Sequence, residues 1–324
     1  MAVEGAVSGA EVPVEVGKIM GKRNLITVLG PTASGKTELA VQLAYNLNGE
    51  IISADSRQVY KKMDIGTGKD LSEYAVGGTQ VPYHLIDIRM PGDKYTLFDY
   101  QHDFHEAYNE ILAREKTPIL CGGTGLYIES ILKGYHLPDV PPNPGLRDDL
   151  EQKSLSELTS ILSDYRPLHN ITDTENKKRA IRAIEIEAYK SKQKSDATTF
   201  APVESIILGL NITRELRRKK ITDRLRTRLQ EGMIEEVQSI LDSGVKADDL
   251  LYYGLEYKFV TLHVIGKMSH DEMFRRLEIA IHQFAKRQMT WFRGMERRGF
   301  IIHWIDASNS LEQKVEQAYS FLGR

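Results

Sequence analysis

Short apolar runs alternate with longer stretches of helical spacing along the chain, and this alternation predicts an α/β fold with a mostly parallel sheet. The predicted strands are Leu25–Leu29, Gly49–Asp55, Val81–Ile88, Pro118–Cys121, Ser205–Asn211 and Gly299–Ile305. The predicted helices are Glu38–Tyr45, Thr96–Arg114, Leu126–Lys133 and most of 145–189 and 214–298.

The pattern changes at Gly134, where strand signals stop and the proline-rich segment Leu137–Pro144 follows. Proline fixes φ and removes an amide donor, so this segment is expected to be stiff and non-helical. The helical stretch after it lies between two predicted strands. We therefore predict an α-helical insertion domain at 134–203 within a core formed by 23–133 and 204–324.

The composition is that of an ordinary soluble protein: 41% of the 324 residues are hydrophobic, 27% are charged and the net charge is -2. Without an overall basic excess, a surface that binds nucleic acid must come from local clusters. The single cysteine, Cys121, excludes an intramolecular disulfide framework and fits a reducing cytoplasm. No apolar run reaches membrane-spanning length, and residues 1–22 lack a signal-peptide core. We expect a cytoplasmic monomer, without membrane association, that has a flexible extension at 1–22.

A glycine-rich segment between the first predicted strand and helix carries the clearest chemical signal. It reads Gly30-Pro-Thr-Ala-Ser-Gly-Lys-Thr37 and matches G-x-x-x-x-G-K-[ST], the phosphate-binding loop. Gly30 and Gly35 permit backbone conformations in which successive N–H groups face an anion. Lys36 adds a positive charge, and the Thr37 hydroxyl can hold Mg²⁺. The segment predicts a diphosphate or triphosphate site in a P-loop NTPase-like fold, formed by Gly30, Pro31, Thr32, Ala33, Ser34, Gly35, Lys36 and Thr37.

Two further segments follow predicted strands. Asp55 comes at the end of the second strand, and the turn Gly122-Gly-Thr-Gly125 comes after the strand Pro118–Cys121. The carboxyl ends of strands in doubly wound sheets face the ligand crevice. We therefore expect both segments to lie near the phosphate-binding loop.

With these segments identified, the order of motifs resembles that of bacterial tRNA dimethylallyltransferases, also called tRNA isopentenyltransferases. The resemblance runs from about Leu25 to Trp304 and includes, beside the phosphate-binding loop, Ser53–Tyr60, Met63–Thr67, Gly122–Tyr127, Asn176–Glu185 and Ala285–Arg293. That family transfers a dimethylallyl group from dimethylallyl diphosphate to N6 of the adenosine 3′-adjacent to the anticodon, releasing diphosphate. The resemblance therefore implies dimethylallyl diphosphate, Mg²⁺ and the tRNA anticodon stem-loop as ligands.

Asp55 is the candidate for the chemistry, because alkylation of N6 requires a base that accepts a proton. The resemblance assigns Asp55 the same role. Two alternatives are Mg²⁺ ligation, as in nucleotide kinases, and capping of the following turn. The predicted catalytic set is Asp55, Thr124, Lys36, Arg214 and Arg224, with the two arginines neutralising the leaving diphosphate.

Basic residues cluster in three places and could contact phosphates of RNA, although single surface charges are more often only solvated. Arg179 and Arg182 share one helix face, a basic run begins at Arg214, and a third cluster lies near Trp291. The residues predicted to contact tRNA are Asp55, Ser56, Arg57, Gln58, Thr124, Arg147, Lys178, Arg179, Arg182, Lys286, Arg287, Gln288 and Arg293.

Three other residues bear on these expectations. Glu256 lies in Tyr253–Lys258, where the family usually has alanine-isoleucine-glycine-tyrosine, and it occupies the expected glycine position. Trp291 is expected to belong to the core rather than to stack on a base. Cys121 is expected to be a buried strand residue and not a nucleophile.

Other functions remain open from the sequence. A prenyltransferase acting on free AMP or ATP would use the same chemistry, and a small-molecule kinase would use the same loop for ATP. The basic C-terminal helices favour a macromolecular acceptor over the first. The Asp55–Gln58 and Lys286–Trp291 segments have no part in phosphoryl transfer, which argues against the second. A non-catalytic RNA-binding module would not need the phosphate-binding loop.

Overall fold

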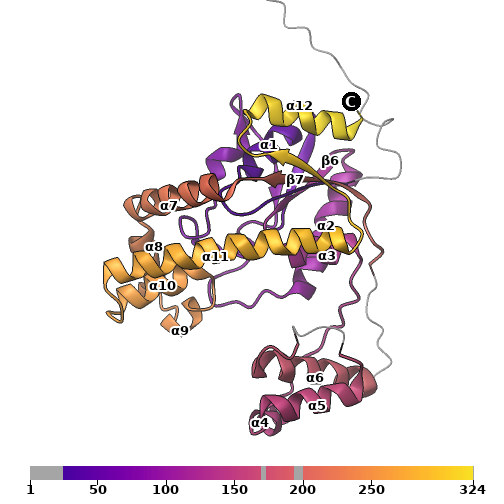
Figure 1. Cartoon of the computed structure of the whole chain (residues 1–324), viewed down its shortest axis with the longest axis vertical. Coiled ribbons are helices and arrows are strands. Elements are labelled where there is room, and N and C mark those ends of the chain that lie inside the picture. Colours follow the sequence, from indigo (N-terminus) through magenta and orange to yellow (C-terminus); the bar gives the residue numbers. More distant parts are fainter. Residues whose placement is uncertain (1–24, 169–172, 193–199, 324) are drawn as a thin grey trace, which may run out of the picture. The chain divides into compact units, whose positions relative to one another are not determined.

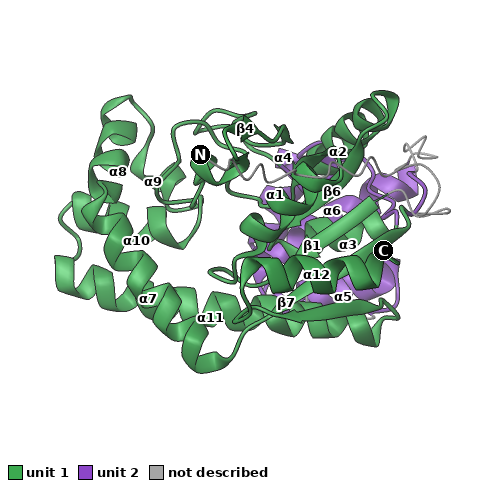
Figure 2. Cartoon of the chain, turned by 90° about the horizontal axis from the view of Figure 1, so that it is seen from above, with its two compact units in different colours: residues 1–95, 99–133, 203–324 green, residues 96–98, 134–202 purple. Residues whose placement is uncertain are grey.

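The computed structural model describes residues 25–168, 173–192 and 200–323, so the predicted extension at 1–22 lies outside the described residues. The chain forms two compact units, which Figure 2 shows in different colours. Unit 1 comprises the described residues of 1–95, 99–133 and 203–324, and unit 2 those of 96–98 and 134–202.

Unit 1 is built on a six-stranded sheet in the order β5-β2-β6-β1-β7-β8, in which every pair of neighbours is parallel. The predicted α/β fold is confirmed. Parallel strands of this kind are buried on both faces, and the burial of β1, β2 and β6 along their whole length fits that rule. The strands are β1 (Leu25–Leu29), β2 (Gly49–Ser53), β5 (Tyr83–His84), β6 (Thr117–Gly122), β7 (Ser205–Asn211) and β8 (Ile302–Asp306).

Helices cover the sheet (Figure 1). The apolar residues of α1 (Lys36–Asn46) and α12 (Leu311–Leu322) share one core cluster with those of β1, β6 and β7. The buried helix α3 (Gly125–Leu132) contacts β6 and the long helix α11 (His270–Arg297). The helix α2 (Leu97–Ala113) precedes β6 in the chain. The carboxyl ends of β1, β2 and β6 meet at one edge, because these three strands are neighbours.

A second apolar cluster joins the helices after β7 to the chain around Val59–Met63. These helices are α7 (Arg214–Gln230), α8 (Met233–Asp242), α9 (Ala247–Leu250), α10 (Leu255–Val264) and α11. The cluster places the helical end of unit 1 beside the segment that follows β2.

Unit 2 contains α4 (Pro144–Glu151), α5 (Leu155–Tyr165) and α6 (Lys177–Lys192). Asn143 caps α4 by accepting a hydrogen bond from the amide of Leu146, and Ser154 caps α5 in a capping box with Glu157. The three helices enclose a small core of their own that includes Leu158, Leu162 and Ile184. With 8 and 11 residues, α4 and α5 are too short to be stable alone, so the shared core with α6 holds them in place.

Two strand predictions need correction. Of Val81–Ile88 only Tyr83–His84 forms a strand, because Leu85 and Asp87 have positive φ values of 62° and 58°, outside the β region. The last strand begins at Ile302 rather than Gly299, since Gly299, with φ of 94°, ends the turn after α11. The structure also contains a short 3₁₀ helix, Leu71–Tyr74, and a hairpin of β3 (Ala75–Val76) and β4 (Thr79–Gln80).

Candidate active site

The loop between β1 and α1 has the backbone of an anion cradle. Gly35, the N-cap of α1, has φ of 80°, and Ala33 also has a positive φ, 61°. Ser34 Oγ is buried and has no hydrogen-bond partner in the described part of the chain. A phosphate oxygen would satisfy this hydroxyl, so the loop fits a diphosphate or triphosphate group.

Position 30 requires glycine because a side chain would not fit there, and not because of the φ angle. This corrects the prediction from the sequence that Gly30 provides a special backbone conformation. Its φ is not positive. A Cβ at this position would lie 2.7 Å from Ser34 Oγ and 3.2 Å from Leu210 Cβ. A side chain there would therefore displace Ser34 from the cradle.

Asp55 follows β2, separated from its last residue by Ala54, and shapes the turn that follows. Its Oδ1 accepts a hydrogen bond of 2.9 Å from the amide of Arg57. This bond is the capping interaction considered from the sequence. Within the described residues Oδ2 makes no hydrogen bond, so one carboxylate oxygen is available to a substrate.

Thr124 fixes the Asp55 turn to the turn after β6. Its Oγ1 accepts from the amide of Ser56 at 3.1 Å, and its own amide donates to Ala54 O at 3.0 Å. The predicted neighbours Asp55 and Thr124 are therefore brought together by hydrogen bonds between their loops.

Gln288, from α11, is bound by the chain at both ends of its amide. Its Oε1 accepts from the amide of Thr32 at 2.9 Å, and its Nε2 donates to Gly123 O at 3.0 Å. The side chain is buried. Gln288 thus joins the phosphate-binding loop to the Gly122–Gly125 turn, a structural role that the sequence did not indicate.

A cavity of about 510 Å³ opens between these loops. It is lined by Lys36 and Thr37, by Asp55–Gln58, by Thr124 and by Arg224. Burial lowers the pKa of Lys36, and the nearby Asp55 carboxylate acts in the opposite direction. A second cavity of about 710 Å³ lies along Ala33–Glu38, and Lys36, Thr37 and Arg224 line both cavities. These three side chains mark the junction where an anion would meet positive charge from two elements.

Arg224 differs from the other predicted catalytic arginine. Its Nη2 lies 3.1 Å from Asp70 Oδ2, which also binds Arg228 at 2.7 Å. Arg214, at the start of α7, lines neither cavity. The structure therefore brings Arg224, and not Arg214, to the phosphate-binding loop.

Glu256 adds a second carboxyl group to the wall of the 510 Å³ cavity, in the first turn of α10. Burial raises its pKa, Asp55 acts in the same direction, and Arg228 and Arg224 oppose the shift. The residue at the family's glycine position thus faces the same space as Asp55.

The exposed face of α11 carries basic and aromatic residues. Trp291 is 37% exposed, so the expectation that it belongs to the core is wrong. A groove of about 590 Å³ is lined by Lys286, Arg287, Trp291 and Arg297, among others. Arg287 and Trp291 also line the 510 Å³ cavity, so the groove and the cavity share a boundary. Arg293 is exposed but lines neither.

In unit 2 the predicted RNA-contacting arginines bind carboxylates of their own chain. Arg147 makes two hydrogen bonds to Glu185, of 2.9 and 2.8 Å, and Arg182 Nη1 binds the same carboxylate. Arg179 pairs with Glu175. Lys178 lies on α6, directly before Arg179. The side chains are exposed enough to meet a ligand, but part of their charge is neutralised.

The described residues have neither a cluster of metal-ligating side chains nor a helix suited to a membrane. They contain no group of three or more His, Cys, Asp or Glu side chains arranged to hold a metal ion. In the same residues no helix combines the length and apolar character needed to cross a membrane. Cys121 is buried, as predicted, and burial raises its pKa to about 12.

Two acidic residues of the site are not predicted by the sequence. Asp70 anchors Arg224 and Arg228, and Glu236 binds the loop that lines the cavity. No local pattern marks these acids, because their partners lie far away in the sequence. A glutamate within an amphipathic helix, such as Glu236, ordinarily indicates only a solvated face.

Family comparisons cover most of the chain. The family model described as "IPP transferase" matches residues 58–295, and that described as "Isopentenyl transferase" matches 23–89. A Porphyromonas gingivalis protein named tRNA dimethylallyltransferase 1 is 66% identical over 90% of this chain and 97% of its own length. A Phocaeicola vulgatus protein named tRNA dimethylallyltransferase 2 is 62% identical over 94% of this chain and 99% of its own.

A solved structure is similar in fold as well. The full-length tRNA isopentenylpyrophosphate transferase of Bacillus halodurans matches with a TM-score of 0.67 at 31% identity. The match covers 93% of this chain and 96% of that one. The similarity therefore extends over the sheet and the helices that follow it.

Proposed function

This chain belongs to the tRNA dimethylallyltransferase family, and from this premise we propose that it transfers a dimethylallyl group from dimethylallyl diphosphate to tRNA. The acceptor is N6 of the adenosine 3′-adjacent to the anticodon, and diphosphate is released. The observation that carries the proposal is the pair of cavities that share Lys36, Thr37 and Arg224, with Asp55 and Thr124 in the wall of one. A donor diphosphate at the shared residues would direct its allylic carbon toward Asp55.

The reaction needs charge neutralisation and a base. N6 attacks the allylic carbon, the bond from that carbon to the diphosphate oxygen breaks, and N6 loses a proton to Asp55. Lys36 and Arg224 would stabilise the negative charge that develops on the leaving diphosphate. Arg224 is held for this task by its ion pair with Asp70. The free Oδ2 of Asp55 supports its role as the base.

Magnesium fits this arrangement without a dedicated cage of carboxylates. Mg²⁺ is usually bound by one or two protein ligands together with substrate phosphates and water. Thr37, which lines both cavities, would supply the protein ligand. When bound, the ion would neutralise charge on the diphosphate. Asp55 as a second ligand remains the alternative to Asp55 as the base.

RNA would be held by basic side chains other than those that bind the donor. Lys286 and Arg287 line the groove beside it, and Arg147, Arg179 and Arg182 belong to unit 2. Phosphate contacts of this kind position a nucleic acid without reading its sequence. The adenine would be read inside the cavity by the Asp55–Gln58 segment.

The proposal is tested by the products and by the choice of acceptor. The protein is incubated with radiolabelled dimethylallyl diphosphate and with tRNA, AMP or both. We expect pyrophosphate release and label in tRNA, with little label in AMP under competition. Label in AMP alone would instead indicate an adenylate prenyltransferase. ADP release in a parallel incubation with ATP, with neither acceptor labelled, would indicate a kinase.

A further inference from the structure

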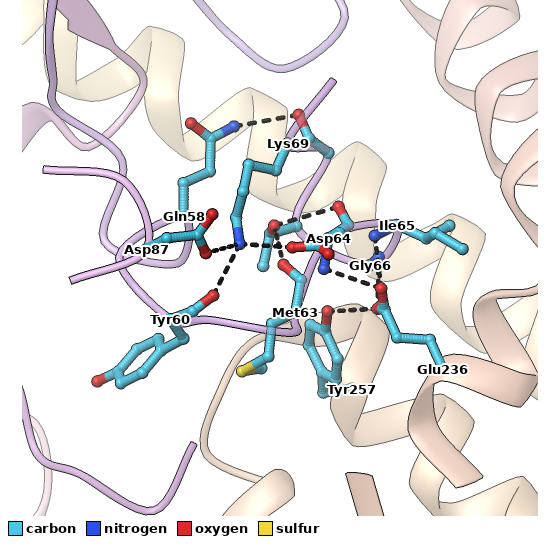
Figure 3. Close-up of polar contacts among 12 residues, drawn as sticks. Gln58, Tyr60, Met63, Asp64, Ile65, Gly66, Lys69, Asp87, Glu236 and Tyr257 are labelled. Atoms are coloured by element: carbon cyan, nitrogen blue, oxygen red, sulfur yellow. Dashed lines mark hydrogen bonds and ion pairs between the residues drawn. The ribbon is translucent and has the colours of Figure 1, made fainter. Parts of the chain in front are cut away.

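Glu236 on α8 holds a loop of the cavity wall through one carboxylate. Its Oε2 accepts hydrogen bonds from the amides of Asp64 and Ile65 at 2.8 and 2.7 Å, and its Oε1 accepts from Gly66 at 3.1 Å (Figure 3). Three successive amides turned toward one anion form a nest. Here the anion is a side chain of the protein itself, so the nest serves to fix the loop.

The same carboxylate also binds the opposite wall. Tyr257 in α10 donates its hydroxyl to Glu236 Oε1 at 2.6 Å. The Tyr257 ring lies so close to Gly66 that a Cβ there would be 2.7 Å from it. Gly66 and Tyr257 both line the 510 Å³ cavity. Glu236 therefore joins two walls of the cavity from outside it.

Lys69 fixes the other end of the loop. Its buried Nζ donates to Tyr60 O at 2.8 Å and to Asp64 Oδ1 at 2.7 Å, and it also binds Asp87 (Figure 3). A buried ammonium with several oxygen partners is costly to move, because displacement would leave it without hydrogen bonds. The residues between these two anchors are thus held in one conformation.

Gly68, within the anchored loop, determines how Gln58 presents its amide. Gln58 Nε2 donates to Gly68 O at 3.1 Å. A carbonyl can only accept, so the NH₂ group must face Gly68 and the two ends of the amide cannot exchange. Within the part of the chain that the structure describes, Oε1 and the second N–H of Gln58 make no hydrogen bond, so they remain for a ligand, and Gln58 lines the cavity. An acceptor beside a donor is the pattern that pairs with the amino group and adjacent ring nitrogen of adenine.

We propose that Glu236 is a positioning residue which, through the 64–68 loop, fixes the amide of Gln58 so that the cavity selects a 6-aminopurine. This inference rests on the proposed function, because it assigns the cavity to an adenine base. A 6-oxopurine would set two acceptors, its O6 and Gln58 Oε1, against each other. Selection would therefore depend on an acid that never touches the substrate.

The experiment compares binding of two anticodon stem-loops that differ only at the acceptor position, adenosine or inosine, in the absence of donor. The wild-type protein should prefer adenosine by about tenfold or more, the range of a good bidentate base contact. Gln58→Leu should bring the preference close to one. Glu236→Gln, which replaces one acceptor oxygen of the nest by an NH₂ group, should lower it at least about threefold.

Two variants serve as controls. Glu235→Gln makes the same charge change at an exposed position one residue earlier on α8 and should keep the wild-type preference. Tyr257→Phe removes only one hydroxyl and should lower the preference slightly, which keeps the test open should Glu236→Gln fail to fold. Dimethylallyl diphosphate binding should stay near wild type in all of these variants.

The outcomes separate this inference from the proposed function. A folded Glu236→Gln protein with the full adenosine preference would overturn the positioning role. A wild-type protein that binds both stem-loops equally but still prenylates adenosine would overturn selection by Gln58 and leave the proposed function intact. A wild-type protein that neither binds nor prenylates the stem-loop would overturn the proposed function itself.

Discussion

Arginine side chains are used differently in the two units. In unit 1, Arg224 reaches the junction of two cavities while a single carboxylate, Asp70, anchors it together with Arg228. In unit 2, Arg147 and Arg182 both bind Glu185, which is 1% exposed while they are 40% and 42% exposed. Two cations are thus bound around one buried anion, and these three residues, Arg147, Arg182 and Glu185, form the hub of unit 2.

Glu185 keeps its negative charge at neutral pH. Although burial acts to raise it, hydrogen bonds from Arg147, the Asn143 amide and Arg182 lower the pKa of Glu185 to about 2. The hub is therefore ionised at neutral pH and carries a net charge of +1. Asp70 with Arg224 and Arg228 carries the same net charge, so the two clusters differ in position: Arg224 lines both cavities, whereas Arg147 and Arg182 line neither.

Replacing Asp55 should give the largest effect, because it removes the proposed base and leaves the charge cradle in place. We expect Asp55→Asn and Asp55→Ala to slow prenyl transfer by roughly a hundredfold or more. Donor affinity should change little. Single-turnover transfer, measured beside a donor-binding titration, checks this.

The same variants distinguish the two roles considered for Asp55. If Asp55 is a metal ligand, Asp55→Ala should weaken Mg²⁺-dependent donor binding, and extra Mg²⁺ should partly restore the rate. A fast Asp55→Asn enzyme would exclude the role of base, since the amide cannot accept the proton.

Lys36→Ala should weaken donor binding by roughly tenfold to a hundredfold, the range for a lost hydrogen bond to a charged group, and should slow transfer as well. RNA affinity should stay near wild type, since Lys36 is not among the proposed RNA contacts. Lys219→Ala is the matched control, because Lys219 is an exposed lysine of α7 that pairs with Asp223. Unchanged donor binding in Lys36→Ala would show that the phosphate-binding loop does not bind the donor.

Glu185→Gln should destabilise unit 2 by about 1–3 kcal/mol at pH 7, because it weakens charged hydrogen bonds to both arginines. The folded pKa of Glu185 lies below its ordinary value, so its contribution is present above about pH 4.5 and is lost as the pH falls toward 2. Hydrogen exchange of α4 and α6 at pH 7 and pH 3 measures this. A difference in exchange between wild type and Glu185→Gln that was larger at pH 3 than at pH 7 would contradict the lowered pKa of Glu185.

Arg179→Ala combined with Arg182→Ala should give the smallest effect, a severalfold loss of tRNA affinity. Each lost phosphate contact should reduce the slope of log affinity against log salt by about 0.7–0.9. Because Glu175 and Glu185 already neutralise part of this charge, we expect the combined change to be smaller than that of two full contacts. Binding isotherms over a salt series give the slope, and an unaltered slope would place these arginines away from the RNA.

The features that could be predicted from the sequence are those whose backbone conformation is determined by nearby residues. The order of β1, the phosphate-binding loop and α1 follows from an apolar run, two glycines and helical spacing within 25–46. The predicted strand at 81–88 failed because tertiary contacts hold Leu85 and Asp87 at positive φ, which no apolar pattern reveals. A local sequence pattern therefore predicts backbone conformation only where neighbouring residues determine that conformation.

The parts of the site that were missed depend on distant partners. Glu236 binds amides about 170 positions earlier in the chain, and Gln288 binds the amide of Thr32 256 positions away. Trp291 was expected in the core from its residue type alone, yet it lies on the exposed face of α11 against Gly125. These side chains acquire their roles only when the sheet edge and the C-terminal helices come together.

The most direct test of the central claim is nucleoside mass spectrometry of unmodified tRNA after incubation with the protein, Mg²⁺ and dimethylallyl diphosphate. We predict one adenosine, 3′-adjacent to the anticodon, whose mass has increased by a single dimethylallyl group attached at N6. The Asp55→Asn protein should yield far less of this nucleoside in the same time. A tRNA digest that contains no prenylated adenosine after incubation with the folded wild-type protein would contradict the account.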